Sequence, residues 1–451
     1  MKQSLVCGLA MVVLACGTGN TSSDSEAFIA WAAQEAVPVA SLEGPLPQSA
    51  LESLRESIGP ARVVGMGESR HDTREQLLLK SLLVKHLITD LGFRAFILEE
   101  SFSHAEAIDR YVTTGEGDLR EVMNSLAGWY LWDTEEMLEL IEWIREFNKG
   151  LDPSQHARVF GMDVSAPGLG VRIVLTSLRA AGIDSGLDAE ALGLLHQRGD
   201  FWPSTWQRYM ALSTGERGRL IENYDALIEF LKLQKTKLVA SSSEDEYEKL
   251  VLLARIGQTG NAMFCAADRG EGGVSRERGM ADTITWILER PMAGEKAILW
   301  AHNLHVAKSE FRMPGLAEGA LEPMGVRLGK TFGDDYIAVG ASFAKGSYPP
   351  DLPPGERAFE TPATDVMDGA LARVEFPVNH HPPAFLIDLR AARPGSPVAK
   401  WLRQEREWVA QDAQSSLSPS AAFDMVFFVR EITRAQPTPL ALRQYQTLGE
   451  Q

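Results

Sequence analysis

The chain has 451 residues, of which 45% are hydrophobic and 23% are charged, a composition typical of soluble globular proteins and not of wholly disordered ones. Its formal net charge of −17 at pH 7 argues against nucleic acid as a partner, because a nucleic-acid-binding face has to neutralise phosphates. A chain of this length is too long for one small core, so we expect either one large α/β body with a substantial insertion or two subdomains.

The first sixteen residues are predicted to be an export signal. A short basic start, Met1-Lys2, precedes an apolar run from Leu5 to Ala15 that is too short to span a bilayer. The ending at Cys16 resembles that of a bacterial lipoprotein signal, and an ordinary secretory signal is the alternative. We therefore expect a lipid on Cys16, a flexible tether over residues 17–27, and export to the bacterial cell envelope with membrane contact only through the anchor.

A strand, a turn and a helix are predicted between residues 62 and 92. Arg62 to Met66 is a short β-branched run, which is typical of a buried strand. From Thr73 the leucines recur with helical spacing until Gly92. Thr73 and Gln76 have the capping-box form, so the helix is expected to begin at Thr73.

The turn between that strand and helix carries polar side chains suited to chemistry. Glu68 and His71 are three residues apart, just before a helix N-terminus. A histidine oriented by a carboxylate can take a proton from water. In an open α/β sheet, such turns lie at the carboxyl end of a strand, where ligands bind.

The remaining chain alternates between predicted strands and helices. An aromatic loop is expected over residues 128–132, followed by a helix over 135–148 that Asp133 and Glu136 could cap. Residues 187–263 have the pattern of a helical insertion. We expect a central, mainly parallel sheet flanked by helices, with further strands at 93–100, 158–163, 296–300, 336–343, 384–389 and 425–429.

Four of these strands end in ionisable residues. Because the carboxyl ends of parallel strands lie along one edge, these groups should meet in one site suited to acid–base chemistry. Glu100 and Asp163 could instead be cap or salt-bridge partners, and the histidines could be structural. The residues concerned are Glu68 with His71, Glu99 with Glu100, Asp163, and His302 with His305.

Motifs for a covalent nucleophile or a nucleotide are missing from the sequence. The surroundings of Ser69 do not form a G-x-S-x-G elbow, because His71 stands where the second glycine is required. There is also no P-loop, dinucleotide fingerprint, H-E-x-x-H or C-x-x-C. Hydrolysis by water that a histidine activates directly fits what remains.

Six blocks of the sequence resemble the erythromycin esterase family, also known as succinoglycan-biosynthesis-like. They lie in the family's order across about residues 62–429. The blocks are the G-E-S-R-H-D-T-R-E run at 67–75, the strand from Phe93 to Glu99, the W-x-x-W and helix block at 129–148, F-G-M-D at 160–163, S-R-E with M-A at 275–281, and W-A-H-N-L-H at 300–305.

The resemblance implies catalytic roles at matching positions. His71 would be the general base that deprotonates water, and Glu68 and Glu99 would orient and charge the site. His302 and His305 would polarise the carbonyl or protonate the leaving alcohol. The family opens the macrolactone of macrolides without an essential cofactor, so a small-molecule ester is the implied partner.

The resemblance also implies a substrate-binding set. Arg74 and Arg276 would bind substrate or hold the carboxylates, and Trp132 and Asp163 complete this set. None of these residues is expected to bind a metal, although related folds include metal-dependent peptidases and a haem-iron-binding lipoprotein.

Arg70 and Asp72 depart from the family motif, which has threonine and glycine there. They place an extra ion pair beside His71, which predicts a different cleft shape near the base. The expected substrate is therefore an ester or lactone, with a macrolide, and hence antibiotic resistance, as one option among other esters. The sequence leaves two further alternatives open. The first is a metal- or haem-binding envelope lipoprotein, or a metal-dependent hydrolase, with ligands among His71, His302, Glu68 and Glu99. The second is a non-catalytic envelope protein that holds a glycan on the aromatic loop at 129–132.

Overall fold

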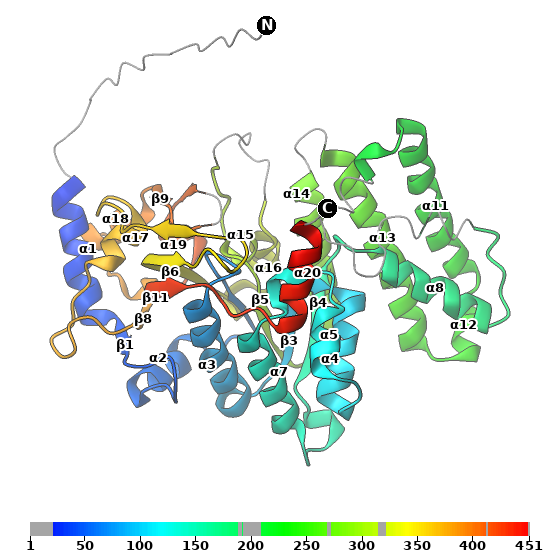
Figure 1. Ribbon diagram of the computed structural model, residues 1–451, viewed down its shortest axis with the longest axis horizontal. Coiled ribbons are helices and arrows are strands. Elements are labelled where there is room, and N and C mark those ends of the chain that lie inside the picture. Colours follow the sequence, from blue (N-terminus) through cyan, green and yellow to red (C-terminus); the bar gives the residue numbers. More distant parts are fainter. Residues whose placement is uncertain are drawn as a thin grey trace, which may run out of the picture.

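A central sheet organises the part of the chain that the computed structural model describes, which is residues 21–187, 192, 209–267, 272–313, 322–411 and 414–449 (Figure 1). The strand order is β1-β8-β11-β6-β2-β5-β3-β4, and β7 pairs with the end of β6. All neighbours from β11 to β4 are parallel, whereas β8 is antiparallel to β11 and β1. The predicted mainly parallel α/β sheet is therefore confirmed.

The strands form where short apolar runs end in glycine or polar residues. The seven runs predicted from the sequence all lie in this sheet, and three-residue strands escaped prediction because their periodicity is too short to detect. The described strands are β1 (Val37–Val39), β2 (Val63–Met66), β3 (Phe93–Ser101), β4 (Arg158–Asp163), β5 (Lys296–Trp300), β6 (Tyr336–Tyr348), β7 (Arg357–Phe359), β8 (Ala384–Asp388), β9 (Arg406–Trp408), β10 (Ser415–Leu417) and β11 (Met425–Thr433).

Alternate residues of each central strand face opposite layers, as the pleat requires. In β2, Val64 belongs to one apolar cluster and Val63 to the other. The helices that share the cluster of Val64 are α2 (Gln48–Ile58), α3 (Arg74–Leu91), α4 (Phe102–Thr114), α5 (Leu119–Asn124), α6 (Trp129–Trp132) and α7 (Glu135–Asn148).

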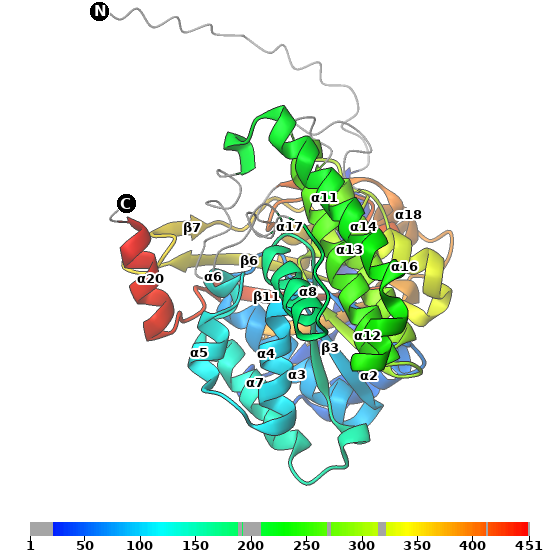
Figure 2. The same ribbon diagram turned by 90° about the vertical axis from the view of Figure 1, so that its right-hand side faces the viewer.

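The opposite face carries more helices, including a layer of long ones. Figure 2 shows α11, α13 and α14 lying side by side across this face. The helices that share the cluster of Val63 are α1 (Thr21–Glu35), α8 (Gly168–Ala180), α11 (Thr214–Leu233), α12 (Lys235–Ser241), α13 (Glu244–Ala267), α14 (Gly272–Glu289), α15 (Asn303–Val306), α16 (Met324–Phe332), α17 (Met367–Ala372), α18 (Pro397–Arg403) and α19 (Pro419–Ala422). Of the insertion predicted at about residues 187–263, residues 209–263 are thus mostly helical.

The start of α3 is correctly predicted, but the capping box is not. Thr73 is the N-cap and Gly92 ends the helix in the left-handed conformation, with φ at 74°. The Thr73 hydroxyl donates to the Arg70 carbonyl instead of capping the helix. Gln76 binds both the backbone and the hydroxyl of Ser69, so its side chain serves the preceding turn.

Two further local predictions are corrected. The N-cap of α7 is Thr134, which accepts from Met137 N, because the Asp133 carboxylate is taken by Asn124 and Thr438. The predicted aromatic loop is a short helix, α6 (Trp129–Trp132).

The N-terminal segment also differs from expectation. α1 begins at Thr21, inside the predicted tether, because its buried face packs on α18, where the rings of Phe28 and Trp401 stack 4.1 Å apart. The predicted signal and Cys16 lie outside the described residues. Within the described ranges, no helix has both the length and the hydropathy needed to span a membrane.

Candidate active site

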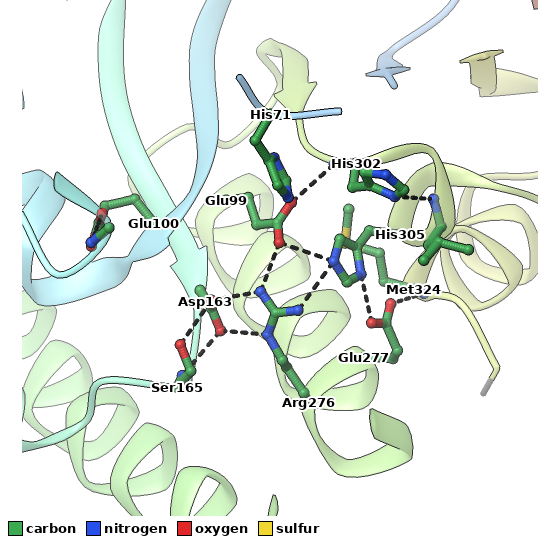
Figure 3. A network of polar contacts seen from close by, with 12 residues as sticks. His71, Glu99, Glu100, Asp163, Ser165, Arg276, Glu277, His302, His305 and Met324 are labelled. Carbon is green, nitrogen blue, oxygen red and sulfur yellow. Dashed lines mark hydrogen bonds and ion pairs between the residues drawn. The ribbon is translucent and has the colours of Figure 1, made fainter. Parts of the chain in front are cut away.

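The carboxyl ends of four neighbouring strands bring the predicted residues together. Turns after β2 and β5 supply His71, His302 and His305, while β3 and β4 supply Glu99 and Asp163 (Figure 3). The ring centroids of His71 and His302 are 5.3 Å apart, and those of His302 and His305 are 6.4 Å apart. The structure therefore shows the expected convergence of these residues. Glu100 is the exception, because its carboxylate accepts from the backbone N–H groups of Ala127 and Gly128, apart from this network (Figure 3).

The turn after β2 has room only for glycine at position 67. A Cβ atom there would come within 2.2 Å of Asn303 Oδ1. Asn303 follows His302 and pairs with the backbone of Ala341 through both its amide atoms. This close approach fixes the turn of His71 against the turn of His302.

Glu68 orients His71 from beneath. Its Oε1 lies 2.5 Å from His71 Nδ1, and its Oε2 accepts from Lys80 Nζ at 2.7 Å. Glu68 and Lys80 are fully buried, whereas the His71 side chain is 18% exposed. Burial raises the pKa of Glu68, but the charges of Lys80 and His71 outweigh burial and lower it to about 2. Glu68 is therefore a fixed anion behind a histidine that reaches the surface.

Glu99 is the central acceptor of a second network. Its Oε1 accepts from Arg276 Nη2 at 2.7 Å and lies 2.9 Å from His305 Nε2, and its Oε2 accepts from the backbone of His302 at 2.9 Å. Burial opposes its charge, but His305, His71 and Arg276 hold its pKa well below the ordinary value. The His71 ring points toward this carboxylate (Figure 3).

His305 lies between two carboxylates. Its Nδ1 is 2.6 Å from Glu277 Oε1, opposite the contact with Glu99. Burial lowers the pKa of His305, but Glu277 and Glu99 more than offset burial and raise it to about 10. Arg276 Nη1 lies 3.1 Å from His305 Nε2. These two groups are close because both Arg276 and His305 donate to the same atom, Glu99 Oε1. His305 is a fixed cation, and both its ring nitrogens are engaged.

His302 is held by backbone groups. Its Nε2 lies 2.9 Å from the Ser69 carbonyl, and its Nδ1 accepts from Leu304 N at 3.2 Å. Burial, with the charges of His71 and His305, lowers its pKa to about 3. A neutral ring that donates through Nε2 fits these partners, so this arrangement favours a positioning role over the proton-donor role suggested by the resemblance.

The predicted substrate-binding residues separate into two groups. Arg276 and Asp163 lie in the site, where Arg276 donates to Asp163 Oδ1 at 3.1 Å and Oδ2 at 2.8 Å. The Arg276 side chain is 24% exposed, so it can reach a ligand. Arg74 instead pairs with Glu43 and Glu136 at 3.4 Å each, away from the central carboxylates.

Trp132 supports the site from within the core. Its side chain is fully buried, its indole N–H donates to the Glu99 carbonyl at 3.2 Å, and its ring meets His71 edge-on at 5.8 Å. Trp129 is also buried, at 2% exposure. The glycan-holding alternative is therefore wrong for these two rings, because a sugar could not stack on them.

Several residues of the site were missed from the sequence. Lys80 and Glu277 each complete a buried charge pair, with Glu68 and His305 respectively. The signal for Lys80 is a lone cation within the leucine-rich run 77–84, most of whose residues are buried in α3. Glu277 belongs to the S-R-E block at 275–281, but that block implied no role for it, and its polar surroundings on α14 do not single it out.

The carboxylates and histidines do not group as metal ligands. Among the described residues, no set of three or more His, Cys, Asp or Glu side chains has the arrangement of a metal site. Lys80 and Arg276 occupy the carboxylates of Glu68 and Glu99. The charge that would attract a divalent cation is thus already paired.

Comparison with protein families matches residues 88–432 to the model described as erythromycin esterase. The matched range begins after the turn of Glu68 and His71 and includes Glu99, Arg276 and His305.

Two relatives are similar to this chain over more than half of its length. Erythromycin esterase type II of Escherichia coli is 29% identical over 315 residues, which cover 65% of this chain and 71% of that protein. A putative hydrolase of Bacillus subtilis (strain 168), YbfO, is 22% identical over 284 residues, 58% of this chain and 60% of the relative.

Solved structures share the fold. A Bacillus cereus protein superposes with a TM-score of 0.75 at 23% identity and covers 93% of this chain and 100% of its own. A succinoglycan biosynthesis protein gives 0.73 at 22% identity, over 94% and 100%. The erythromycin esterase EreC, in an open conformation, gives 0.69 at 17% identity, over 90% and 99%.

Proposed function

Because the chain belongs to the erythromycin esterase family, we propose that it is a hydrolase that cleaves an ester or lactone with water activated by His71. The 2.5 Å contact between Glu68 and His71 carries this proposal. It joins a buried anion, which Lys80 keeps charged, to a partly exposed imidazole.

His71 is the base in this proposal. With Glu68 on Nδ1, a neutral His71 takes a proton at Nε2, and the anion stabilises the imidazolium that results. His302 and His305 are poorer candidates, because both residues are buried, whereas the His71 side chain is partly exposed.

Arg276 is the cation best placed to stabilise negative charge on a substrate oxygen. It is the more exposed partner of its pairs with Glu99 and Asp163, and these two carboxylates fix its guanidinium. A donor held in place before reaction stabilises an oxyanion without reorganising, which is the usual source of large electrostatic effects.

The steps balance with water as the only co-reactant. Water gives a proton to His71 and its oxygen bonds to the carbonyl carbon. The carbonyl oxygen of the tetrahedral species then carries the negative charge, beside Arg276. When the carbon–oxygen bond to the alcohol breaks, the imidazolium returns its proton to the leaving oxygen.

The proposal is tested by incubating the full-length protein with macrolides and small aryl esters and measuring a gain of one water by mass spectrometry. Because one base is removed, His71→Asn should lower kcat by about 10²–10⁴-fold. Reaction in ¹⁸O-labelled water should place the label in the acid product, since water is the nucleophile.

His381→Asn is the matched control, because this histidine is 59% exposed and its only described ion pair is a long contact of 3.8 Å with Glu375. It should leave kcat unchanged. Normal turnover by a folded His71→Asn protein would refute the role of His71, and absence of the label from the acid would refute direct attack by water.

The proposal also covers the cofactor requirement of the reaction and the attachment of the protein to a membrane. We propose catalysis without a metal, so a chelator should leave turnover unchanged. Stoichiometric zinc, manganese or iron in the active protein would contradict this.

We also propose that Cys16 carries a lipid. Labelled palmitate should enter the wild-type protein and not the Cys16→Ser protein, and membrane anchoring of Cys16→Ser would contradict the proposal.

A further inference from the structure

The two residues that depart from the family motif form an enclosed ion pair. Arg70 Nε lies 3.3 Å from Asp72 Oδ1, and the two side chains are only 7% and 17% exposed. They flank His71 directly in the sequence. A pair shielded from water in this way keeps a defined geometry, unlike ion pairs on an open surface.

Tyr348, the last residue of β6, completes the pair. Its hydroxyl donates to Asp72 Oδ1 at 2.6 Å and lies 3.4 Å from Arg70 Nε, which donates to it. Burial and the charge of Asp72 keep the pKa of Tyr348 far above its ordinary value, so the phenol stays a neutral donor. The Arg70 guanidinium also lies 5.0 Å from the centre of the Phe359 ring on β7.

The backbone of the turn is anchored on both sides of His71. Before it, Ser69 N donates to Gln76 on α3 at 3.0 Å. After it, the Asp72 carbonyl accepts from Ala435 N at 2.9 Å, beyond the end of β11. The side chains of Arg70 and Asp72 add a third attachment, to the β6–β7 hairpin.

We propose that Arg70, Asp72 and Tyr348 form a clamp that positions the His71 ring on Glu68 and couples the β6–β7 hairpin to proton transfer. The inference rests on the proposed function of His71. All three are positioning residues, because they act through the backbone that carries His71. A base misplaced by about 1 Å can lose about 100-fold in rate, so the clamp should be visible in kinetics.

Tyr348→Phe tests the clamp with little change in volume. It removes the hydroxyl but keeps the ring beside Arg70, and it changes no charge. We expect kcat to fall by about 10- to 100-fold, because proton transfer depends on the placement of His71. KM should change by less than about 3-fold, since the clamp residues do not bind substrate.

Position 72 provides the rescue experiment. Asp72→Asn keeps an oxygen that can accept from Tyr348 but removes the charge opposite Arg70, so its kcat should lie between those of the wild-type protein and Asp72→Ala. Asp72→Ala removes that oxygen and should behave like Tyr348→Phe. A role in stability alone would not reproduce this order among the folded proteins.

Tyr111→Phe is the matched control. Tyr111 is also buried, and its hydroxyl also donates to a carboxylate, that of Glu142, but it joins α4 to α7. It loses a comparable hydrogen bond and should keep the wild-type kcat. Thermal unfolding of both variants shows whether their losses of stability are similar.

Histidine NMR separates the clamp from the hydrolase proposal. The His71 ring signals, assigned with His71→Asn, should titrate at a different pH in Tyr348→Phe and at the wild-type pH in Tyr111→Phe. This measurement needs no substrate, so it still decides on the clamp if the wild-type protein cleaves no ester. Unchanged His71 titration in both Tyr348→Phe and Asp72→Ala would overturn the clamp.

Discussion

Glu68 keeps a negative charge at a position without exposed side-chain surface. Lys80 Nζ contacts its carboxylate at 2.7 Å and also lies 3.9 Å from the centre of the Trp300 ring. Burial lowers the pKa of Lys80 to about 8, against the opposing effect of Glu68, so both members are charged at neutral pH. Charges buried in this way stabilise the fold only while they are paired.

Lys80→Met should therefore strongly destabilise the protein. Removing one member of a buried pair costs about 3–5 kcal/mol, because the other charge is left uncompensated. Urea unfolding gives the change in free energy. Lys85→Met, a partly exposed lysine of the same helix, should cost less than about 1 kcal/mol.

The double variant Glu68→Gln with Lys80→Met provides the internal check. It removes both charges, so it should be more stable than Lys80→Met alone. If the single variant were as stable as the wild-type protein, the buried pair would not have the energetic role assigned to it.

At the scale of residues, the sequence predicts which groups meet but not the role of each. Strand ends identified Glu68, Glu99 and the three histidines, because residue type and position are visible in a sequence. The roles of His302 and His305 depend on whether each ring meets a backbone carbonyl or a carboxylate. Those partners come from Ser69 and Glu277, which no local pattern connects to them.

At the scale of elements, α6 is held against the site from several sides. The Glu100 carboxylate accepts from the backbone N–H groups of Ala127 and Gly128, and burial raises its pKa to about 8. The C-terminal helix α20 (Pro439–Gly449), beside α6 in Figure 2, covers the other side. Its Tyr445 donates to the Tyr130 carbonyl at 2.7 Å, and the rings of Tyr445 and Trp129 are 5.0 Å apart.

Two substitutions at Tyr445 separate these contacts. Tyr445→Phe loses only the hydrogen bond and should cost about 1 kcal/mol of unfolding free energy. Tyr445→Ala also loses the aromatic contact and should cost about 2 kcal/mol or more. Urea unfolding at constant pH measures both, and equal losses would show that the ring contact contributes nothing.

The same scale separates what local sequence can predict from what it cannot. Apolar β-branched runs predicted the seven longest strands, because burial on both faces leaves a continuous signal. The predicted capping roles of Gln76 and Asp133 are wrong, because each side chain binds another partner. Gln76 binds Ser69 in the preceding turn, and Asp133 binds Thr438, which is far away in the sequence. Capping rules consider only the few residues around a helix start.

At the scale of the whole molecule, the site joins elements that are far apart in the chain. The parallel sheet made its location predictable, because all the central strands end at one edge. The amino-acid composition did not predict the balance of positive and negative charges within the site, because the net charge of −17 counts the surface as well as the site. The described network contains the carboxylates of Glu68, Glu99, Asp163 and Glu277 and the cations Lys80, Arg276 and His305.

This network makes the stability of the whole protein depend on pH through His305. Its pKa of about 10 in the folded protein lies above the ordinary value of 6.5, so the folded state binds its proton more tightly. The resulting stabilisation is complete below about pH 6.5 and is lost as pH rises toward 10. One extra proton in the folded state corresponds to a loss of about 1.4 kcal/mol per pH unit within that range.

Comparison with His305→Gln isolates this contribution, because the titration of Lys80 and Glu100 is common to both proteins. The unfolding free energy of the wild-type protein should exceed that of the variant most at about pH 6. This difference should shrink steadily between about pH 6 and pH 9, because the unfolded histidine loses its proton in this range while the folded one keeps it. Urea unfolding of both proteins across this range measures the difference. A difference that stays constant from about pH 6 to 9 would mean that His305 is not the proton-holding cation between Glu99 and Glu277.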